Sequence, residues 1–474
     1  MSKLKNVVAV PLICVSLSAC MTSSKTVTKA APAGYTANKG NGSFTLKPFK
    51  EVVLDNGLKI IYVRDETLPR VSFTMLVKTG NMQEPVAEAG LNAMTAYLLE
   101  QGTQSRDAMK IADEFGQMGS SLDINPGYDV TTIYADSLTS SAEKMLDVFS
   151  DVIMNPAFKD MEIARMRSQV MSALKKKVDN PSSYADEQMD LFLFGEHPYG
   201  RDVNGTVDGV KALTKQEIIK HYLTFYRPNN TTMAVVGQFD DAFEKQVQDI
   251  FSKWTKRTIP VVAVTTPPPI DRLQVKLIVK KGLKQTQIRL SQVGIDRKDS
   301  DFIPLRLANE ALGGSFGSRL NQKVRDDLGL TYSIYSSFDV RKERGSFDIS
   351  TFTKNETAAK ALDETLKVVA DYDAGGATDA EVTASRNQLV GQFPRAIETA
   401  DRLVYNLLVL DFYGISNDYL VDYIKNVNKI KPKEINAAFK RHIDAKNFKV
   451  IVYGNDSIVP QFEKYKPEVI RLNN

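Results

Sequence analysis

Only three side chains in this chain of 474 residues carry an imidazole: His197, His221 and His442. A zinc site in a protein needs several imidazole, thiolate or carboxylate ligands close together. His197 precedes a proline in a predicted turn, whereas His221 and His442 lie on predicted amphipathic helices, and none has a second histidine nearby. We expect each to be an ordinary turn or helix-surface residue, with no carboxylate completing a ligand set. A zinc site in this chain alone is therefore not expected.

Both cysteines lie in or directly after a predicted export signal. Lys3 and Lys5 precede an apolar run that is too short to span a bilayer and that ends in LSAC at Cys20. This ending resembles the lipobox of bacterial lipoproteins, which implies that residues 1–19 are removed and that Cys20 receives lipid. An ordinary signal peptide cut nearby is the alternative. Since Met21 follows the cysteine instead of an aspartate, the resemblance implies anchoring in the outer membrane, facing the periplasm. The mature chain then has no free thiol.

A short segment rich in glycine, LGGSFGSRL, places Gly313, Gly314 and Gly317 after a predicted helix. Glycine permits backbone conformations and close approaches that other side chains forbid. The segment could therefore contact an extended peptide through its backbone. A plain connector between two helices is the alternative.

The composition is that of a globular protein with a sizeable core. Hydrophobic residues make up 43% of the chain and charged residues 25%, and 61 Lys and Arg against 57 Asp and Glu leave a net charge of +4. There is no long basic run, so we expect no nucleic-acid partner.

Changes in composition and a run of prolines divide the chain into segments. Residues 21–47 are rich in Ser, Thr, Ala, Gly and Lys, which is typical of a flexible tether. Three consecutive prolines at 267–269 cannot continue a helix or a central strand and predict an extended linker. The expected segments are a signal peptide, a lipidated cysteine with its tether, an N-terminal domain, a linker and a C-terminal domain, at residues 1–19, 20–47, 48–254, 255–271 and 272–474.

The two long segments end alike. Residues 230–237 and 447–454 each run from an asparagine through an apolar strand to a glycine. Each strand follows an amphipathic helix of similar character, LTKQEIIKHYLTFY in one segment and IKPKEINAAFKRHI in the other. We expect two copies of one α+β unit. Chance similarity of two strand–turn units is the alternative.

Several segments together resemble the pitrilysin/insulinase family of zinc metallopeptidases, in the branch that includes the mitochondrial processing peptidase. They are LDNGLKIIYV, AGL and GT around the helix at residues 88–103, HPYGRDVNGT, YRPNNTTMAVVG, and LGGSFGSRLNQKVRDDLGLTYSIYSSF. The resemblance covers nearly all of the chain from about residue 49. It implies two homologous α/β-sandwich-like domains, each an antiparallel sheet packed by helices, that form a clamshell.

In that family the helix between AGL and GT carries His-x-x-Glu-His, in which two imidazoles hold zinc and the glutamate acts on the bound water. The two histidine positions fall on Ala93 and Tyr97, and the glutamate position falls on Ala96. The third ligand of the family, a later glutamate, falls near Ser172 and Ala173. Alanine offers no lone pair and neutral tyrosine is a poor zinc ligand. We therefore expect no metal in this chain and place the zinc in a partner subunit.

The second half resembles the family at its substrate-binding arginine and tyrosine, although the first half lacks the zinc motif. The segment SRLNQKVRDDLGLTYS resembles the family segment whose arginine and tyrosine hold the substrate and stabilise the oxyanion, which implies these roles for Arg325 and Tyr332. A solvated helix residue and a packed strand residue are the alternatives. The glycine-rich segment with Gly313, Gly314 and Gly317 resembles in position the glycine-rich loop of the non-catalytic subunit, although it is shorter here.

These observations lead to the hypothesis of a catalytically incomplete peptidase subunit. It would give Arg325, Tyr332 and chamber walls to a homologous, zinc-bearing partner that hydrolyses a peptide substrate. The alternative is a non-enzymatic, lipid-anchored scaffold or peptide holder with the same fold. A self-sufficient peptidase is a weak option, because no serine or aspartate forms a recognisable nucleophile arrangement with a histidine.

Overall fold

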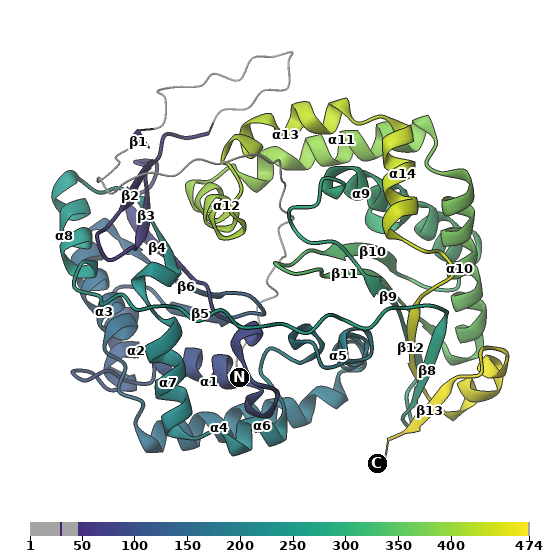
Figure 1. Cartoon of the computed structure of the whole chain (residues 1–474), viewed down its shortest axis with the longest axis horizontal. Helices are drawn as coiled ribbons and strands as arrows, with labels where there is room; N and C mark the ends of the chain where they lie inside the picture. The colour runs from purple at the N-terminus through teal and green to yellow at the C-terminus, as the bar shows by residue number, and fades with distance from the viewer. Residues whose placement is uncertain (1–28, 31–45, 473–474) are drawn as a thin grey trace.

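The computed structural model describes residues 29–30 and 46–472 (Figure 1). The predicted signal peptide, Cys20 and most of the predicted tether lie outside these residues. In the part of the chain that is described, no helix combines the length and the apolar character needed to cross a bilayer.

The first half of the chain folds around a seven-stranded mixed sheet. Asn56 and Gly57 form the turn of the predicted hairpin, with Gly57 at a φ of +87°. In spatial order the strands are β1 (Lys29–Ala30), β2 (Lys50–Val53), β3 (Lys59–Arg64), β7 (Thr231–Gly237), β4 (Arg70–Val77), β6 (Thr131–Leu138) and β5 (Leu122–Pro126).

Eight α-helices of the described residues accompany this sheet in the chain. They are α1 (Leu91–Leu99), α2 (Ala108–Gln117), α3 (Ala142–Met154), α4 (Asp160–Lys176), α5 (Pro181–Phe194), α6 (Val207–Ala212), α7 (Lys215–Phe225) and α8 (Asp241–Phe251). Along β6 buried residues alternate with partly exposed ones, whereas β7 is buried throughout. A strand buried on both faces must be covered from both sides. The second cover comes from the other half of the chain.

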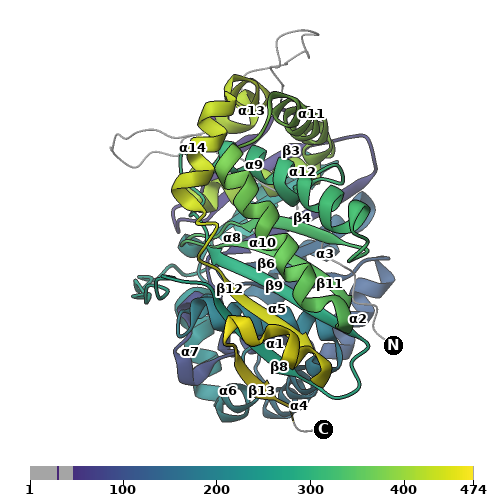
Figure 2. The same cartoon turned by 90° about the vertical axis from the view of Figure 1, so that its right-hand side faces the viewer.

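The second half folds around a six-stranded mixed sheet. Its strands in spatial order are β10 (Ile334–Asp339), β11 (Ser346–Lys354), β9 (Gln285–Val293), β12 (Lys449–Gly454), β8 (Gln274–Val279) and β13 (Glu468–Arg471). Its α-helices are α9 (Phe302–Asn309), α10 (Ala358–Gly375), α11 (Asp379–Ala396), α12 (Ala400–Tyr413), α13 (Asp418–Lys429) and α14 (Pro432–His442). Figure 2 shows α10 lying across the strands of this sheet, where it packs on β9 and β11.

The predicted repeat is confirmed by the strand order. The series β3-β7-β4-β6-β5 in the first sheet matches β8-β12-β9-β11-β10 in the second, including one parallel pair followed by antiparallel pairs. The predicted α+β class with two homologous units is therefore confirmed. The sheets are mixed instead of purely antiparallel, because β7 and β12 each return after several helices and pair in parallel with the strand at the start of their unit.

The two halves exchange one helix each. Helix α12 belongs to the second half but packs on β7, β3 and β4 of the first sheet, beside which it lies in Figure 1. Helix α5 belongs to the first half but packs on β9 and β12 of the second sheet. Hydrogen bonds hold both helices on the opposite sheet. Asp411 of α12 accepts from Lys59 at 3.0 Å and from Thr232 at 2.6 Å. Ser182 of α5 accepts from Arg289 at 2.8 Å. Each half therefore completes the core of the other.

Residues 255–271 between the halves form neither helix nor strand. They include the three prolines from which the sequence predicts a linker.

Candidate functional site

Helix α1 begins at a point that only glycine can occupy. Gly90 has a φ of +104°, and a Cβ there would lie 2.7 Å from the carbonyl oxygen of Asn204. The first turn is capped from outside the helix, because the buried Glu84 carboxylate accepts the backbone N–H groups of Gly90 and Asn92 at 3.1 and 2.6 Å. Burial raises the pKa of Glu84 to about 7. The frame of the helix is thus held firmly in place.

Ala93, Ala96 and Tyr97, at which the resemblance predicts the zinc motif, are three closely spaced residues of α1. Ala93 and Ala96 have no exposed surface. The Tyr97 hydroxyl donates to Asn204 Oδ1 at 2.7 Å, and burial raises its pKa, so the phenol stays neutral. These three residues do not fit a zinc ion.

His221 lies close to α1 but is not a substitute ligand. Its Nε2 is 3.3 Å from both Thr79 Oγ1 and Asn92 Oδ1, and burial lowers its pKa to about 3. The expectation of a helix-surface residue is wrong, since His221 packs as a neutral core residue. His197 is also buried, and its Nδ1 accepts the backbone N–H of Tyr199 at 3.1 Å.

The predicted third ligand position lies on α4. Ser172 and Ala173 are both exposed there, and the Ser172 hydroxyl donates to the carbonyl of Ser168 at 2.8 Å. No carboxylate from α4 can complete a site at this point, because none occurs between residues 165 and 178.

His442 has carboxylate neighbours that its sequence context does not reveal. Its Nε2 lies 2.9 Å from Asp301 and 3.8 Å from Asp299, and these three form a cluster that could hold a cation. Both oxygens of Asp301, however, already accept from Arg441 at 2.9 and 2.7 Å. The expectation that no carboxylate joins a histidine is wrong here, because the partners lie about 140 residues away in sequence. The cluster is an ion-pair network that joins α14 to the start of α9.

The side chains of Arg325 and Tyr332 are accessible from the surface, unlike those of Ala93 and Ala96 on α1. Arg325 lies in a π-helical turn, η8 (Asn321–Asp327), with its guanidinium 4.4 Å from the ring centre of Phe316. Tyr332 is 81% exposed and precedes β10, so it is not the packed strand residue of the alternative interpretation. Both side chains can meet a molecule from outside.

The three glycines have two different structural roles. A Cβ at Gly313 would lie 2.5 Å from Ser336 Oγ, and a Cβ at Gly314 would lie 2.6 Å from Asn309 Nδ2, so both are required by close packing in the turn η7 (Glu310–Gly314). A Cβ at Gly317 would meet nothing within 4 Å. Only Gly317 is available for a backbone approach by another molecule.

Sequence reasoning missed two aromatic side chains in this region. Phe316 is 73% exposed at the tip of the glycine-rich segment, and Tyr335 is 51% exposed on the edge strand β10. Phe316 is the one of these side chains for which a contact with Arg325 is described, and Tyr332 and Tyr335 are exposed on and next to β10. The presence of a phenylalanine between two glycines is the one sequence signal that could have identified the tip.

Two family models match the chain. The model described as Insulinase (Peptidase family M16) matches residues 59–207, and the model described as Peptidase M16 inactive domain matches residues 212–389.

Curated relatives are similar over most of the chain. The uncharacterized zinc protease YmxG of Bacillus subtilis is 25% identical over 353 residues, which cover 74% of this chain and 85% of the relative. The uncharacterized zinc protease SCO5738 of Streptomyces coelicolor is 26% identical over 426 residues, which cover 87% and 91%.

Solved structures share the fold. The peptidase M16 inactive domain from Pseudomonas fluorescens matches with a TM-score of 0.79 at 24% identity, over 86% of this chain and 98% of that one. A protease from Helicobacter pylori matches with a TM-score of 0.80 at 18% identity, over 86% and 100%. Since models of one peptidase family match residues 59–207 and 212–389, which together make up most of the chain, this chain belongs to the M16, or insulinase-like, peptidase family.

Proposed function

We propose that this chain is the catalytically incomplete subunit of a heteromeric zinc metallopeptidase in the processing-peptidase-like branch of the family. A homologous partner subunit would hold the zinc, and this chain would supply Arg325, Tyr332 and walls of the peptide chamber. One contrast carries the proposal. Ala93 and Ala96, which stand at one histidine position and at the glutamate position of the family motif, are buried and offer no side-chain ligand or base, whereas Arg325 and Tyr332 remain accessible.

The chemistry left in this chain suits the substrate side of peptide hydrolysis. When a peptide carbonyl is attacked, its oxygen gains negative charge, and N–H and O–H donors aimed at that oxygen lower the barrier. Arg325 offers a guanidinium and Tyr332 a phenol hydroxyl. The stacking of Arg325 on Phe316 restricts the guanidinium before substrate arrives.

The proposal includes a location. Lipid on Cys20 would anchor the subunit to the outer membrane with its folded part in the periplasm. The basic residues, the apolar run and the LSAC sequence at the start of the chain support this location.

Capture of the partner is the first test. The full chain, tagged at its C-terminus and solubilised from membranes with detergent, should co-purify with a homologue that contains His-x-x-Glu-His, and metal analysis should find one zinc per pair. The chain purified alone should contain no stoichiometric zinc and should cleave no peptide. Stoichiometric zinc in the isolated chain would overturn the proposal.

The second test concerns the shared site. In the reconstituted pair, Arg325→Ala should lower kcat/KM for peptide hydrolysis by about 10²-fold, the effect of losing one oxyanion donor. Lys323→Ala is the matched control, because Lys323 is a half-exposed cation in the same turn. Unchanged hydrolysis by the Arg325→Ala pair would refute a shared active site.

A non-enzymatic, lipid-anchored peptide holder is the second candidate. The exposed side chains of Phe316, Tyr332 and Tyr335 favour it, since a peptide could pack on them without cleavage. Peptide binding by the isolated chain, together with the absence of a zinc-bearing partner in the capture experiment, would select this function.

A further inference from the structure

The edge strands β5 and β10 occupy equivalent places in the two halves. Helix α9 packs against β10, α11 and α14 just as α1 packs against β5, α4 and α7. Each edge strand leads into a turn, β5 at residues 127–130 before β6 and β10 at residues 340–345 before β11. In Figure 1 the two strand pairs point toward each other near the centre of the molecule. The two turns are therefore placed where the halves meet.

Arg341, in the turn after β10, is inserted into the first half. Its guanidinium carbon lies 3.8 Å from the ring centre of Tyr128 and 4.6 Å from that of Tyr199, and the residue is only 7% exposed. Its Nε donates to Asp339, the last residue of β10, at 2.7 Å. A cation that stacks on aromatic rings away from water is held more strongly than one at the surface. Arg341 thus joins the end of β10 to the turn that follows β5.

The HPYG segment at residues 197–200, to which the proposed function gives no role, forms the other side of this contact. The buried Tyr199 hydroxyl donates to Asp129 Oδ1 at 2.7 Å and accepts the backbone N–H of Glu343 at 3.1 Å. Asp129 Oδ2 accepts the backbone N–H of Lys342 at 3.0 Å. One phenol and one carboxylate of the first half therefore bind two consecutive backbone groups of the second. The joint is the name used below for Tyr128, Asp129, Tyr199 and residues 341–343.

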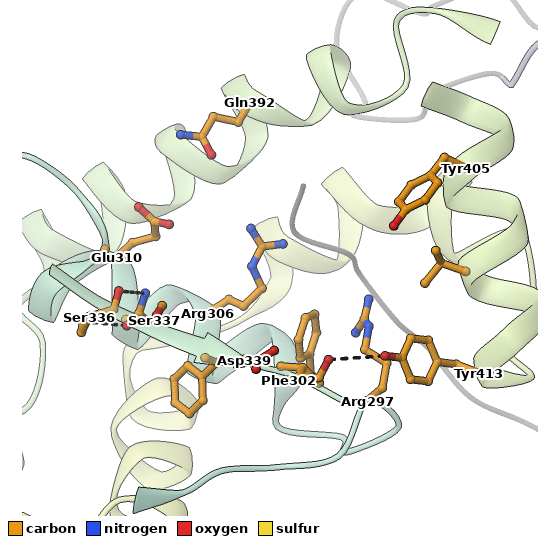
Figure 3. A pocket seen from close by; sticks show the side chains of 15 residues that line it. Arg297, Phe302, Arg306, Glu310, Ser336, Ser337, Asp339, Gln392, Tyr405 and Tyr413 are labelled. Carbon is orange, nitrogen blue, oxygen red and sulfur yellow. Dashed lines mark hydrogen bonds between the residues drawn. The ribbon is translucent and has the colours of Figure 1, made fainter. Parts of the chain in front are cut away.

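A cavity of about 450 Å³ extends from the joint among α9, β10, α11 and α12 (Figure 3). Its wall includes Arg306 of α9 and the exposed Gln392 of α11, and Val340 lines it next to the joint. The Tyr413 hydroxyl of α12 donates to the carbonyl of Val340 at 3.4 Å, a contact that is drawn in Figure 3. Because α12 also packs on the first sheet, it holds the turn after β10 from a second side.

Apolar packing crosses the boundary between the halves at two places. One hydrophobic cluster joins Leu193 and Phe194 of the first half to Ile278 and Ile451 of the second. Residues of β3, β4 and β7 belong to the large cluster of the second half, namely Ile61, Val63, Leu76, Ala234 and Val236. Domains of one chain are expected to move relative to each other unless their interface is large and hydrophobic. The packing here favours halves that stay together.

We propose that the joint fastens the ends of the two edge strands together, with Tyr199 and Arg341 as positioning residues, so that the two halves of this chain act as one body. The joint fixes the spacing between β5 and β10, and with it the place of Tyr332 relative to the first half. One consequence rests on the proposed function: in the pair, a peptide enters the chamber where this chain meets its partner and not between its own halves.

Amide hydrogen exchange of the full chain in detergent reads the joint directly, because the N–H groups of Lys342 and Glu343 are bound across it. Both amides should be protected. Tyr199→Phe removes the acceptor of Glu343 and should speed its exchange about fivefold, the effect of one lost hydrogen bond. Tyr372→Phe is the matched control, since Tyr372 is equally buried and its hydroxyl has no hydrogen-bond partner among the described residues. Unprotected amides at 342 and 343, or equal exchange in the two variants, would overturn the proposal.

Cutting the linker tests whether the contacts hold the halves together without it. A protease site inserted after Val261, which is 99% exposed, allows cleavage of the purified full chain. The two fragments should then elute as one species. Arg341→Met should raise the concentration at which the cut fragments separate about tenfold, whereas Arg471→Met, at an exposed cation on β13, should not. Separation of the unmodified fragments would overturn the proposal. If Arg341→Met does not fold, Tyr199→Phe in the cut chain decides the same question.

The proposals for the joint and for the shared active site fail separately. Exchange and linker cutting are measured on this chain alone, whereas the shared active site is measured as hydrolysis by the reconstituted pair. Addition of peptide to the pair should leave the exchange of residues 342 and 343 unchanged. Faster exchange there would mean that the chain opens between its halves and would overturn the joint. A pair without hydrolysis but with a protected joint would refute only the shared site.

Discussion

The two equivalent regions of this molecule differ in their side chains: the region around α1 is filled with buried small residues, whereas the region around α9 has charged residues at a cavity. Each helix is followed directly by a glutamate at its C-cap, Glu100 in the first half and Glu310 in the second. Four residues before it stands Ala96 in one helix and Arg306 in the other. Ala96 is buried without exposed surface, whereas Arg306 reaches into a cavity of about 450 Å³.

The difference shows that two copies of one unit can keep the fold while equivalent helices carry different side chains. On α1, small apolar residues and the neutral Tyr97–Asn204 hydrogen bond occupy the positions at which the resemblance predicts the zinc motif, so these positions bring no buried charge. In the second unit charged groups persist because their region is open and can be solvated. The first region is therefore packed as core, whereas the second leaves charged side chains at a cavity.

The largest expected effect comes from returning a charged group to α1. Ala96→Glu places a carboxylate where no surface is exposed, so we expect a loss of about 3 kcal/mol or more in the free energy of unfolding. Urea unfolding followed by circular dichroism measures it. Gln392→Glu, which adds the same group to the wall of the second region, should cost less than about 0.5 kcal/mol. Equal losses in the two variants would refute the contrast between the regions.

Two glycines of the glycine-rich segment, Gly313 and Gly317, should differ next most in how much an alanine substitution lowers the free energy of unfolding. Gly313→Ala forces a Cβ to within 2.8 Å of the Ser336 backbone nitrogen and should destabilise the chain by about 1–3 kcal/mol. Gly317→Ala meets nothing within 4 Å and should be neutral or slightly stabilising. The same unfolding experiment compares them. If Gly317→Ala proved the more damaging, the packing explanation for Gly313 would be wrong.

The phenol of Tyr332 should matter for activity and not for stability. In the reconstituted pair, Tyr332→Phe removes one O–H donor and should lower kcat about tenfold. The free energy of unfolding should change by less than about 0.5 kcal/mol, because the side chain is 81% exposed. Steady-state kinetics and urea unfolding of one preparation give both values. A loss of stability with unchanged kcat would assign Tyr332 to the fold instead.

Local signals in the sequence were sufficient for much of the fold. The Asn56-Gly57 turn, the three-proline linker and the asparagine-to-glycine strands of the repeat all rely on backbone preferences that act within a few residues. The exchange of α5 and α12 could not be predicted from such signals. It depends on contacts such as Asp411 with Lys59, which are 352 residues apart.

Some features of the candidate site could likewise be predicted from the sequence, and others depend on tertiary packing. The resemblance located Ala93, Ala96 and Tyr97 on a buried helix, but the burial of His221 and the two aspartates beside His442 depend on tertiary packing. The cavity beside Arg306 was also missed. Its lining residues come from several separate segments, among them α9, β10, α11 and α12, and no one segment reveals the cavity in the sequence.

The last contrast concerns the pH dependence of stability contributed by the two glutamates that directly follow α1 and α9. Burial, with Asp123 nearby, raises the pKa of Glu100 to about 7, and burial also raises the pKa of Glu310, where Arg306 acts in the opposite direction. A carboxyl whose pKa is raised by folding binds more protons in the folded state, so its contribution to stability is present below the unfolded pKa and is lost as the pH rises through the folded pKa. Between about pH 4.5 and about 7, Glu100→Gln should therefore lose less stability than the unmodified chain. Glu310→Gln should show the same sign with a smaller size, because Arg306 already offsets part of the cost of ionisation. Urea unfolding over this pH range gives both difference curves. A larger difference for Glu310 would mean that Arg306 does not stabilise its carboxylate.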